Sequence, residues 1–516
     1  MRCLLLVVLF FFCSSACSHA APWIADISEV SEVVALEEGP DSVTVWLPSG
    51  ERATVGVYGT ESIRVTSPPE VGVERFVQYL WHREVFRNTD EKHVAAIPYW
   101  LPSRRWRPPG QETGGPYALQ LHARAEGDFQ VAIACDDDKV LTIDLHVTPS
   151  IPDPDMGFGF YFCPPHHKYP KDFRKYFEHM RDLRNNTFTI YQSHPAELET
   201  GPERIAWQLD LALDTGLIDG KVPIFVMHCN PPDIDGAYQY GRRVEEWPEL
   251  LGYGKDEPGN TEQHEAEARG MVSMFNGAGY RSGSAISDTS LYRFGDGLDI
   301  WICLMSDFND MLKREALRQE KELWAYSCTT RGTNAPLNRY FSGWWCFKNR
   351  PRVLMTWTYM DDMLAMGVPE PSSVQEDGKW TPCGYFEFSL GAPDGPISSV
   401  GLEARRDGIV DYMVLRELER AILAARVNQD EDPVFHALIK EASQWLQNQV
   451  DLVDVNFWPN DVNPEGDCVL PNPCHWDARD LVAPPEGLRD FNGLRRQAME
   501  YTEFLKQGPI TPAESG

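Results

Sequence analysis

Residues 250–259, LLGYGKDEPG, form an apolar run that ends in two adjacent carboxylates and a Pro-Gly pair. An apolar run with glycines that stops at Pro-Gly is typical of a strand passing into a loop. Strand ends are where α/β barrels place their chemistry. Asp256 and Glu257 would raise each other's proton affinity, so that one of them can act as a general acid near neutral pH. Because an acidic chain also contains such pairs by chance, the interpretation depends on the surrounding sequence.

Around this stretch, apolar runs of strand length alternate with segments of helical periodicity. The predicted strands are residues 157–163, 188–192, 223–228, 250–255, 280–287, 299–305, 322–328 and 352–360. The predicted helices include residues 171–183, 263–275, 308–318, 338–347 and 402–425. Eight β units closed by a last helix predict a (β/α)8 TIM barrel. The connection after the third strand is long and poorly helical, which makes it the weakest unit of the pattern.

The sequence before the barrel has short β-type runs separated by turns, which predict a β-sandwich with an insertion rich in Pro, Trp and Arg at residues 98–116. The runs are residues 42–47, 53–58, 62–66, 117–123, 129–134 and 140–147. After the barrel, residues 433–450 and 488–506 are predicted as helices of a packing appendage. We therefore expect a multidomain chain with a signal peptide at 1–20, a β-sandwich at 21–150, a catalytic barrel at 155–425 and a helical region at 426–516.

The N-terminus has the pattern of a secretory signal peptide: Arg2, an apolar stretch at residues 4–12, and small residues up to Ala20. The apolar stretch is too short to cross a bilayer as a helix, and no later run is long enough to be a membrane span. These features predict a secreted or periplasmic protein. Anchoring as a lipoprotein through Cys17 is a weaker alternative.

The charge balance excludes two classes of partner. The chain has 47 basic and 77 acidic residues, with a formal charge of −30. Nucleic acids and anionic membranes both require a basic face, so neither is an expected partner. The cysteines show neither a CxxC pair nor the spacing of a zinc site, and we expect no metal and no cofactor.

A second stretch carries a family resemblance. Residues 406–412, RDGIVDY, follow a Leu-Glu step and resemble the barrel-closing helix of glycoside hydrolase family 123 and its uncharacterised relatives. Arg339, Trp345 and Trp357 look like the family's Arg-then-Trp and strand-eight Trp elements, which implies that they bind substrate. The resemblance covers residues 156–425 and implies a β-sandwich on a (β/α)8 barrel with retaining β-N-acetylgalactosaminidase activity.

The resemblance also implies a mechanism. Most retaining glycosidases use two separated carboxylates, one of them as the nucleophile. Adjacent carboxylates suit substrate assistance instead, in which the 2-acetamido oxygen of the sugar attacks the anomeric carbon. The resemblance implies that Glu257 is the general acid and then the base, and that Asp256 orients the acetamido group and stabilises the charge of the cyclic intermediate.

Further candidates come from the predicted strand ends, where aromatic side chains could stack on a sugar. Trp357 and Tyr359 share one face of the eighth predicted strand, and Tyr326 lies near the end of the seventh. Packing in the core is the alternative for each aromatic, and we prefer it for Trp324. His228 ends the third strand and is interpreted as a substrate contact.

The expected partner is a carbohydrate that contains N-acetylhexosamine, most simply terminal β-linked N-acetylgalactosamine. Asp361 and Asp362 follow the eighth strand and favour a solvated loop pair, with a role at sugar hydroxyls or a metal as the alternative. Two other functions stay open. One is a glycosidase of this fold that acts on another glycoside, because a barrel does not fix chemistry. The other is a non-catalytic carbohydrate-binding surface protein.

Overall fold

The computed structural model describes most of the chain. The described residues are 22–26, 39–86, 92–102, 117–136, 138–162, 173–191, 201–255, 258, 262–286, 295–327, 335–356, 359, 389–392, 395–427, 432–453 and 484–508. The predicted signal peptide lies outside them, as do Asp256, Glu257, Trp357, Asp361 and Asp362.

The chain divides into two compact units. Unit 1 comprises residues 1–80, 99–151 and 490–496, and unit 2 comprises residues 81–98, 152–489 and 497–516.

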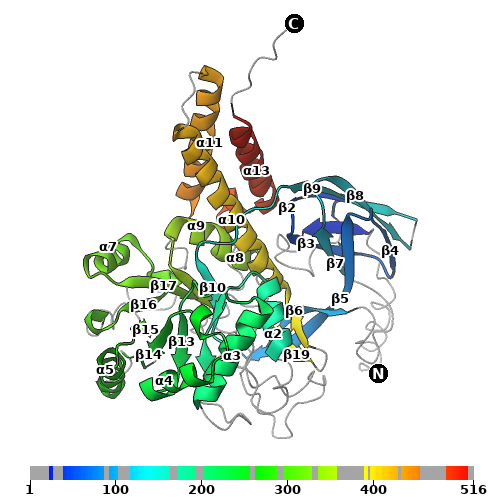
Figure 1. Ribbon diagram of the computed structural model, residues 1–516. Coiled ribbons are helices and arrows are strands. Elements are labelled where there is room, and N and C mark those ends of the chain that lie inside the picture. The colour runs from blue at the N-terminus through cyan, green and yellow to red at the C-terminus, as the bar shows by residue number, and fades with distance from the viewer. Residues whose placement is uncertain are drawn as a thin grey trace, which may run out of the picture. The chain divides into compact units, whose positions relative to one another are not determined.

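The first unit contains the predicted β-sandwich (Figure 1). One sheet has the strand order β1 (Trp23–Asp26), β3 (Arg52–Tyr58), β7 (Tyr117–Ala123), β5 (Val71–Phe86) and β6 (Lys92–Pro102). Residues 81–86 of β5 and 92–98 of β6 are assigned to unit 2. The other has the order β2 (Ser42–Pro48), β9 (Val140–Thr148), β8 (Gly127–Cys135) and β4 (Ile63–Thr66). Alternate residues of both sheets form one buried cluster, including Val45, Val55, Leu119, Val131 and Ile143. This alternation is what two sheets packed face to face require.

Strands β1, β5 and β6 were not predicted. β5 runs antiparallel to β7, from Val71 opposite Ala123 to Val77 opposite Tyr117. Its sequence places Glu74 and Arg75 side by side, so the alternation of apolar and polar residues that marks a half-buried strand is broken there. Backbone hydrogen bonds to β7 stabilise this strand, although its side-chain pattern does not predict a strand.

The second unit contains the predicted barrel, and each of the predicted strands is confirmed. Its parallel strands are β10 (Gly157–Phe160), β11 (Thr187–Phe188) with β12 (Ile190–Tyr191), β13 (Ile224–Met227), β14 (Leu250–Tyr253), β15 (Ser282–Ile286), β16 (Ile300–Leu304), β17 (Glu322–Ser327) and β18 (Val353–Thr356). β18 pairs with β10, which brings the sheet round towards closure.

The second barrel strand is split at Thr189. Its first half, β11, pairs with β10, and its second half, β12, pairs with β13. Thr189 keeps the two halves in register, because its N–H donates to Phe160 O at 3.1 Å and its Oγ1 accepts from Phe162 N at 3.1 Å. The barrel is therefore nearly closed rather than evenly hydrogen-bonded all round.

Helices follow most of the strands and cover the outside of the sheet (Figure 1). They are α2 (Phe173–Asp182), α3 (Gly201–Thr215), α4 (Pro231–Tyr240), α5 (Glu262–Gly277), α7 (Asp310–Arg318), α8 (Ala335–Tyr340), the π-helix η6 (Phe341–Trp345), α9 (Cys346–Asn349) and α10 (Val400–Val427). A hairpin of β19 (Ser389–Ala392) and β20 (Gly395–Ser398) precedes α10.

The prediction of a poorly helical connection after the third strand was wrong, because α4 occupies it. Asn230 and Asp233 form a capping box at its start, and two prolines stand at its first positions, where a missing N–H costs nothing. Gly236 lies where α4 approaches α3: a Cβ there would be 2.9 Å from Pro202 Cγ. The prolines, which in a helix interior would break it, here mark the start of α4. The glycine allows the close contact between α4 and α3.

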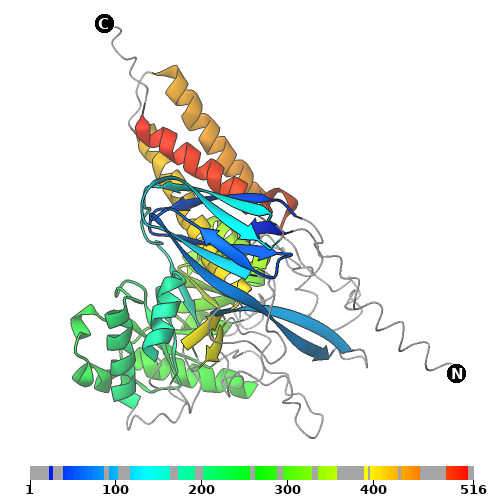
Figure 2. The ribbon, with the colours of Figure 1, turned by 90° about the vertical axis from the view of Figure 1, so that its right-hand side faces the viewer.

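The region after the barrel is helical, as predicted. It contains α11 (Pro433–Leu452) and α13 (Phe491–Gln507). The two helices run side by side (Figure 2), with Trp445 and Tyr501 in ring contact at 5.7 Å and the Tyr501 hydroxyl donating to Glu441 at 2.9 Å. Among the residues that the structure describes, no helix has the length and apolar character needed to cross a membrane.

Candidate active site

The fourth barrel strand leads directly to the two predicted catalytic carboxylates. β14 ends at Tyr253, and Gly254 N donates to Gly283 O at 2.8 Å, which continues the ladder with β15 by one residue. A Cβ at Gly252 would lie 2.2 Å from the Phe275 ring, so a glycine is needed where α5 packs on β14. The strand that carries the chain to Asp256 and Glu257 is therefore held on both its sheet edge and its outer face.

Lys255, the last described residue before the pair, forms an ion pair with Glu267 of α5, with Nζ 2.9 Å from Oε2. This hydrogen bond holds the pKa of Glu267 below its ordinary value. The lysine cation therefore has a carboxylate partner on α5, which ties the end of the strand to that helix.

Three tyrosines meet inside the barrel at the carboxyl ends of its strands. Tyr161 follows β10, Tyr253 ends β14 and Tyr326 lies near the end of β17; the Tyr161 ring is 6.4 Å from that of Tyr253 and 6.3 Å from that of Tyr326. Tyr326 is 8% exposed and the other two are 3% exposed. They form a nearly closed aromatic floor at the end of the barrel where active sites lie.

The lower layers of the barrel are ordinary core. Trp324 packs edge-on against Phe225 at 4.8 Å and donates its indole N–H to Glu322 at 2.7 Å, which confirms the preference for packing at this residue. Sequence analysis selected Tyr326 but missed Tyr161 and Tyr253. Their signal was available, since both are aromatic residues at the carboxyl ends of predicted strands.

His228 lies immediately after β13 and has a positive φ of 57°. Left-handed backbone is uncommon for residues other than glycine, and such residues cluster at functional sites. The side chain is exposed, whereas the neighbouring Cys229 is buried and burial raises the pKa of its thiol to about 12. Of these two neighbours, His228 is thus the one exposed at this end of the barrel.

Tyr359 was predicted as a sugar platform, but its ring is fully buried among packing aromatics. It lies 5.4 Å from Phe160 and 6.5 Å from Tyr176 of α2, on the outer side of the barrel strands. Its hydroxyl is 2.5 Å from His179 Nδ1, and His179 Nε2 is 2.7 Å from Ser398 Oγ. This position suits a core residue that joins β20 to α2, and it offers no ring face to a sugar.

We expect Tyr359→Phe to lower the free energy of unfolding by about 1–3 kcal/mol, because His179 loses a buried hydrogen-bond partner. Turnover and KM should stay at wild-type values below the unfolding temperature. Thermal unfolding and kinetics on one preparation check both statements. A rise in KM with stability unchanged would return Tyr359 to the substrate site.

Arg339 and Trp345 were also predicted to bind substrate, and both are buried away from solvent, at 0% and 1% exposure. Arg339 forms a two-pronged ion pair with Asp411 of α10, with Nε–Oδ2 at 2.6 Å and Nη2–Oδ1 at 3.2 Å. Trp345 packs against Phe308 at 5.4 Å. The ion pair makes Arg339 part of the packing between α8 and α10, and Trp345 packs against the segment before α7, so the described contacts of both residues are packing contacts.

The RDGIVDY stretch forms the other side of this packing. A Cβ at Gly408 would lie 2.3 Å from Arg339 O, and one at Gly343 would lie 2.9 Å from Gly408 O, so the two helices touch through their backbones. Next to it, Arg405 stacks 4.4 Å from the Phe160 ring and donates to Asn185 Oδ1 at 2.7 Å; burial lowers its pKa to about 9. The contacts of the second motif are thus those of a helix packed closely on the barrel.

Within the described residues, no group of three or more His, Cys, Asp or Glu side chains is arranged to hold a metal ion. The histidines and carboxylates described at the carboxyl ends of the strands do not form a ligand set.

Comparison with known proteins gives the class of fold. No family model matches the sequence, and no curated protein matches it. Among solved structures, the chain is similar to a family 123 glycoside hydrolase from Clostridium perfringens, with a TM-score of 0.58 and 11% identity over 94% of this chain and 99% of that one. A family 5 xyloglucanase from Bacteroides ovatus has a TM-score of 0.28 at 10% identity, over 71% of this chain and 98% of its own. This score is too low to indicate a shared fold.

The chain thus has the β-sandwich and barrel fold of a family 123 glycoside hydrolase, and the resemblance predicted from the sequence is confirmed at the level of the fold. At 11% identity, the likeness does not carry over the other protein's activity.

Proposed function

We propose that this protein is a glycoside hydrolase that removes terminal β-linked N-acetylhexosamine, specifically N-acetylgalactosamine. The observation that carries the proposal is the Asp256-Glu257 pair directly after the fourth strand of a barrel whose fold matches that of a family 123 enzyme. The matched enzyme is described as hydrolysing glycolipid glycans, which supports a complex glycan as the substrate. The N-terminal signal pattern supports action outside the cytoplasm.

In the proposed mechanism the sugar supplies the nucleophile. Asp256 hydrogen-bonds the acetamido N–H and turns its oxygen towards the anomeric carbon. Glu257 donates a proton to the leaving oxygen; the ring-closed oxazolinium intermediate forms as the glycosidic bond breaks, and Glu257 then takes a proton from the water that reopens it. The neighbouring negative charge of Asp256 favours the protonated form of Glu257 until the cationic intermediate develops.

The tyrosine floor fits this chemistry. Tyr161, Tyr253 and Tyr326 present apolar rings with hydroxyl groups, the combination that sugars use for stacking and hydrogen bonding. A nearly closed aromatic floor also keeps bulk water away from the underside of the anomeric carbon. Water then cannot attack the intermediate from that face.

The test compares aryl N-acetyl-β-galactosaminide with the glucosaminide and with plain β-galactoside. We expect hydrolysis only of the substrates that carry the 2-acetamido group, and fastest for the galactosaminide. A thiazoline analogue of the sugar should inhibit competitively, because it resembles the cyclic intermediate. A 2-fluoro glycoside should leave the intact mass of the protein unchanged, since no side chain becomes glycosylated.

Two results would replace this proposal. A fluoroglycosyl adduct mapped to Asp361 or Asp362 would establish ordinary double displacement and another glycoside substrate. Binding of N-acetylhexosamine glycans without turnover of any of them would establish a non-catalytic carbohydrate-binding protein.

A further inference from the structure

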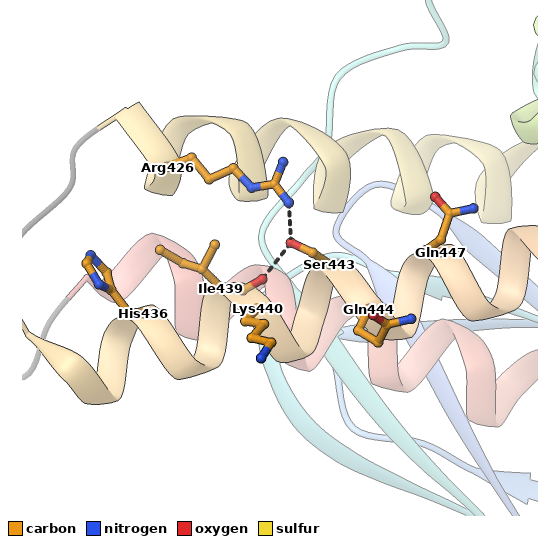
Figure 3. Close-up of a pocket in the computed structure, with 7 residues that line it drawn as sticks. All are labelled: Arg426, His436, Ile439, Lys440, Ser443, Gln444 and Gln447. Atoms are coloured by element: carbon orange, nitrogen blue, oxygen red, sulfur yellow. Dashed lines mark hydrogen bonds between the residues drawn. The ribbon is translucent and has the colours of Figure 1, made fainter.

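A groove of about 500 Å³ lies between the end of α10 and α11, in the helical region after the barrel (Figure 3). Its lower wall is one stripe of α11, made by residues spaced three and four apart: His436, Ile439, Lys440, Ser443, Gln444 and Gln447. Arg426 reaches across from α10 and donates to Ser443 Oγ at 2.8 Å. The volume is in the range of small-ligand sites.

The stripe is polar where a helix facing another helix is normally apolar. The packing residues of α11 lie on an adjacent face and are Phe435, Ile439, Ala442 and Leu446. Only Ile439 belongs to both sets. The groove is therefore an additional surface of a helix that has already buried its apolar face.

Two cations line the groove. Arg426 and Lys440 both line it, and within the described residues neither forms an ion pair. Nearby carboxylates have other partners: Asp432 accepts from Val434 N at 2.8 Å and Glu441 accepts from Tyr501. On a chain with a formal charge of −30, two cations that line one groove and form no ion pair within the described residues favour an anionic ligand.

Two glutamines of the same stripe present hydrogen-bond acceptors to the groove. Gln444 donates its amide N–H to Asn448 Oδ1, and Gln447 donates to Asp451 Oδ1, both at 2.8 Å. Each bond leaves the side-chain carbonyl of the glutamine as an acceptor. An inorganic anion such as sulfate has no hydrogen-bond donor for these acceptors, whereas the hydroxyl or amide groups of a sugar can donate to them.

We propose that this groove binds an acidic oligosaccharide, with its carboxylate or sulfate at Arg426 and Lys440 and its hydroxyl groups at Gln444 and Gln447. From His436 to Gln447 the helix advances about 16 Å, which suits a short oligosaccharide rather than a single ion. The groove is a binding site for acidic glycans distinct from the barrel end, and it does not depend on the proposed hydrolase activity.

The test is calorimetric titration of the full-length protein with four probes: a sulfated disaccharide, a glucuronate-containing disaccharide, a neutral disaccharide and inorganic sulfate. We expect an acidic disaccharide to bind about tenfold or more tightly than the neutral one and than sulfate, and to bind more weakly as salt rises. The tighter of the two acidic ligands identifies the anionic group.

Variants locate the binding. Lys440→Glu should weaken binding of the acidic disaccharide about tenfold or more, and Gln444→Leu should weaken it without changing the affinity for sulfate. The matched control is Arg314→Glu, an exposed cation on α7 of the barrel, which should bind as the wild type does. Turnover of small aryl glycosides should be the same in all three variants, so failure here is separate from failure of the proposed hydrolase activity.

Three results would overturn the proposal: no binding of either acidic disaccharide at millimolar concentration, sulfate binding as tightly as the sulfated sugar, or equal effects of Lys440→Glu and Arg314→Glu.

Discussion

Glu257→Gln is expected to lower kcat/KM by about 10²–10⁴-fold for glycosides with poor leaving groups, because these need a proton on the departing oxygen. Aryl glycosides with acidic phenols should lose far less, since their leaving groups depart without a proton. The measurement is kcat/KM for a disaccharide and for a nitrophenyl glycoside with the same terminal sugar.

The pH profile separates loss of an acid from loss of structure. The wild-type rate should fall at high pH as Glu257 loses its proton, and this alkaline limb should disappear in the Gln variant. Glu262→Gln makes the same chemical change at an exposed residue in the first turn of α5 and should leave both substrates and the profile unchanged. An equal loss on both substrate types would remove Glu257 from the acid role.

The barrel could be predicted because its strands carry their own signal. Each is a short apolar run bounded by turns, and residues 250–255 and 322–328 coincide with β14 and β17. α4 was missed in a connection predicted to be poorly helical, although the capping box at Asn230 and the prolines after it mark a helix start. β5 was missed because it depends on pairing with β7, about forty residues further along the chain, which no local pattern reports.

In the candidate site too, features that depend on local sequence could be predicted, and features that depend on distant contacts could not. The carboxyl end of a predicted strand is a local feature, and it led to Tyr326 and to the segment before Asp256. Whether Arg339 faces a pocket or a helix depends on α10, which lies 72 residues away at Asp411. Tyr359 depends in the same way on His179, which lies 180 residues away. That Arg, Trp and Tyr are common in sugar-binding sites does not predict which distant residue the fold places beside each of them.

The second large effect expected is on stability, for Arg339→Met. This change leaves Asp411, which is 3% exposed, as a buried carboxylate without its guanidinium partner, and should lower the free energy of unfolding by about 3–5 kcal/mol. The double variant Arg339→Met, Asp411→Leu should recover most of that loss, because a buried pair can be replaced by packed apolar groups at little cost. Denaturant unfolding of the two variants and the wild type measures both differences.

The double variant also decides between packing and substrate binding at Arg339. If the residue only joins α8 to α10, the double variant has a wild-type KM once its fold is restored. Arg318→Met, which removes the exposed partner of Glu315 on α7, serves as the control for losing an ion pair and should have a far smaller effect on stability. A double variant that is stable but has a strongly raised KM would contradict the packing role. Its fold would be intact while its substrate affinity was lost, which would place Arg339 in contact with the sugar.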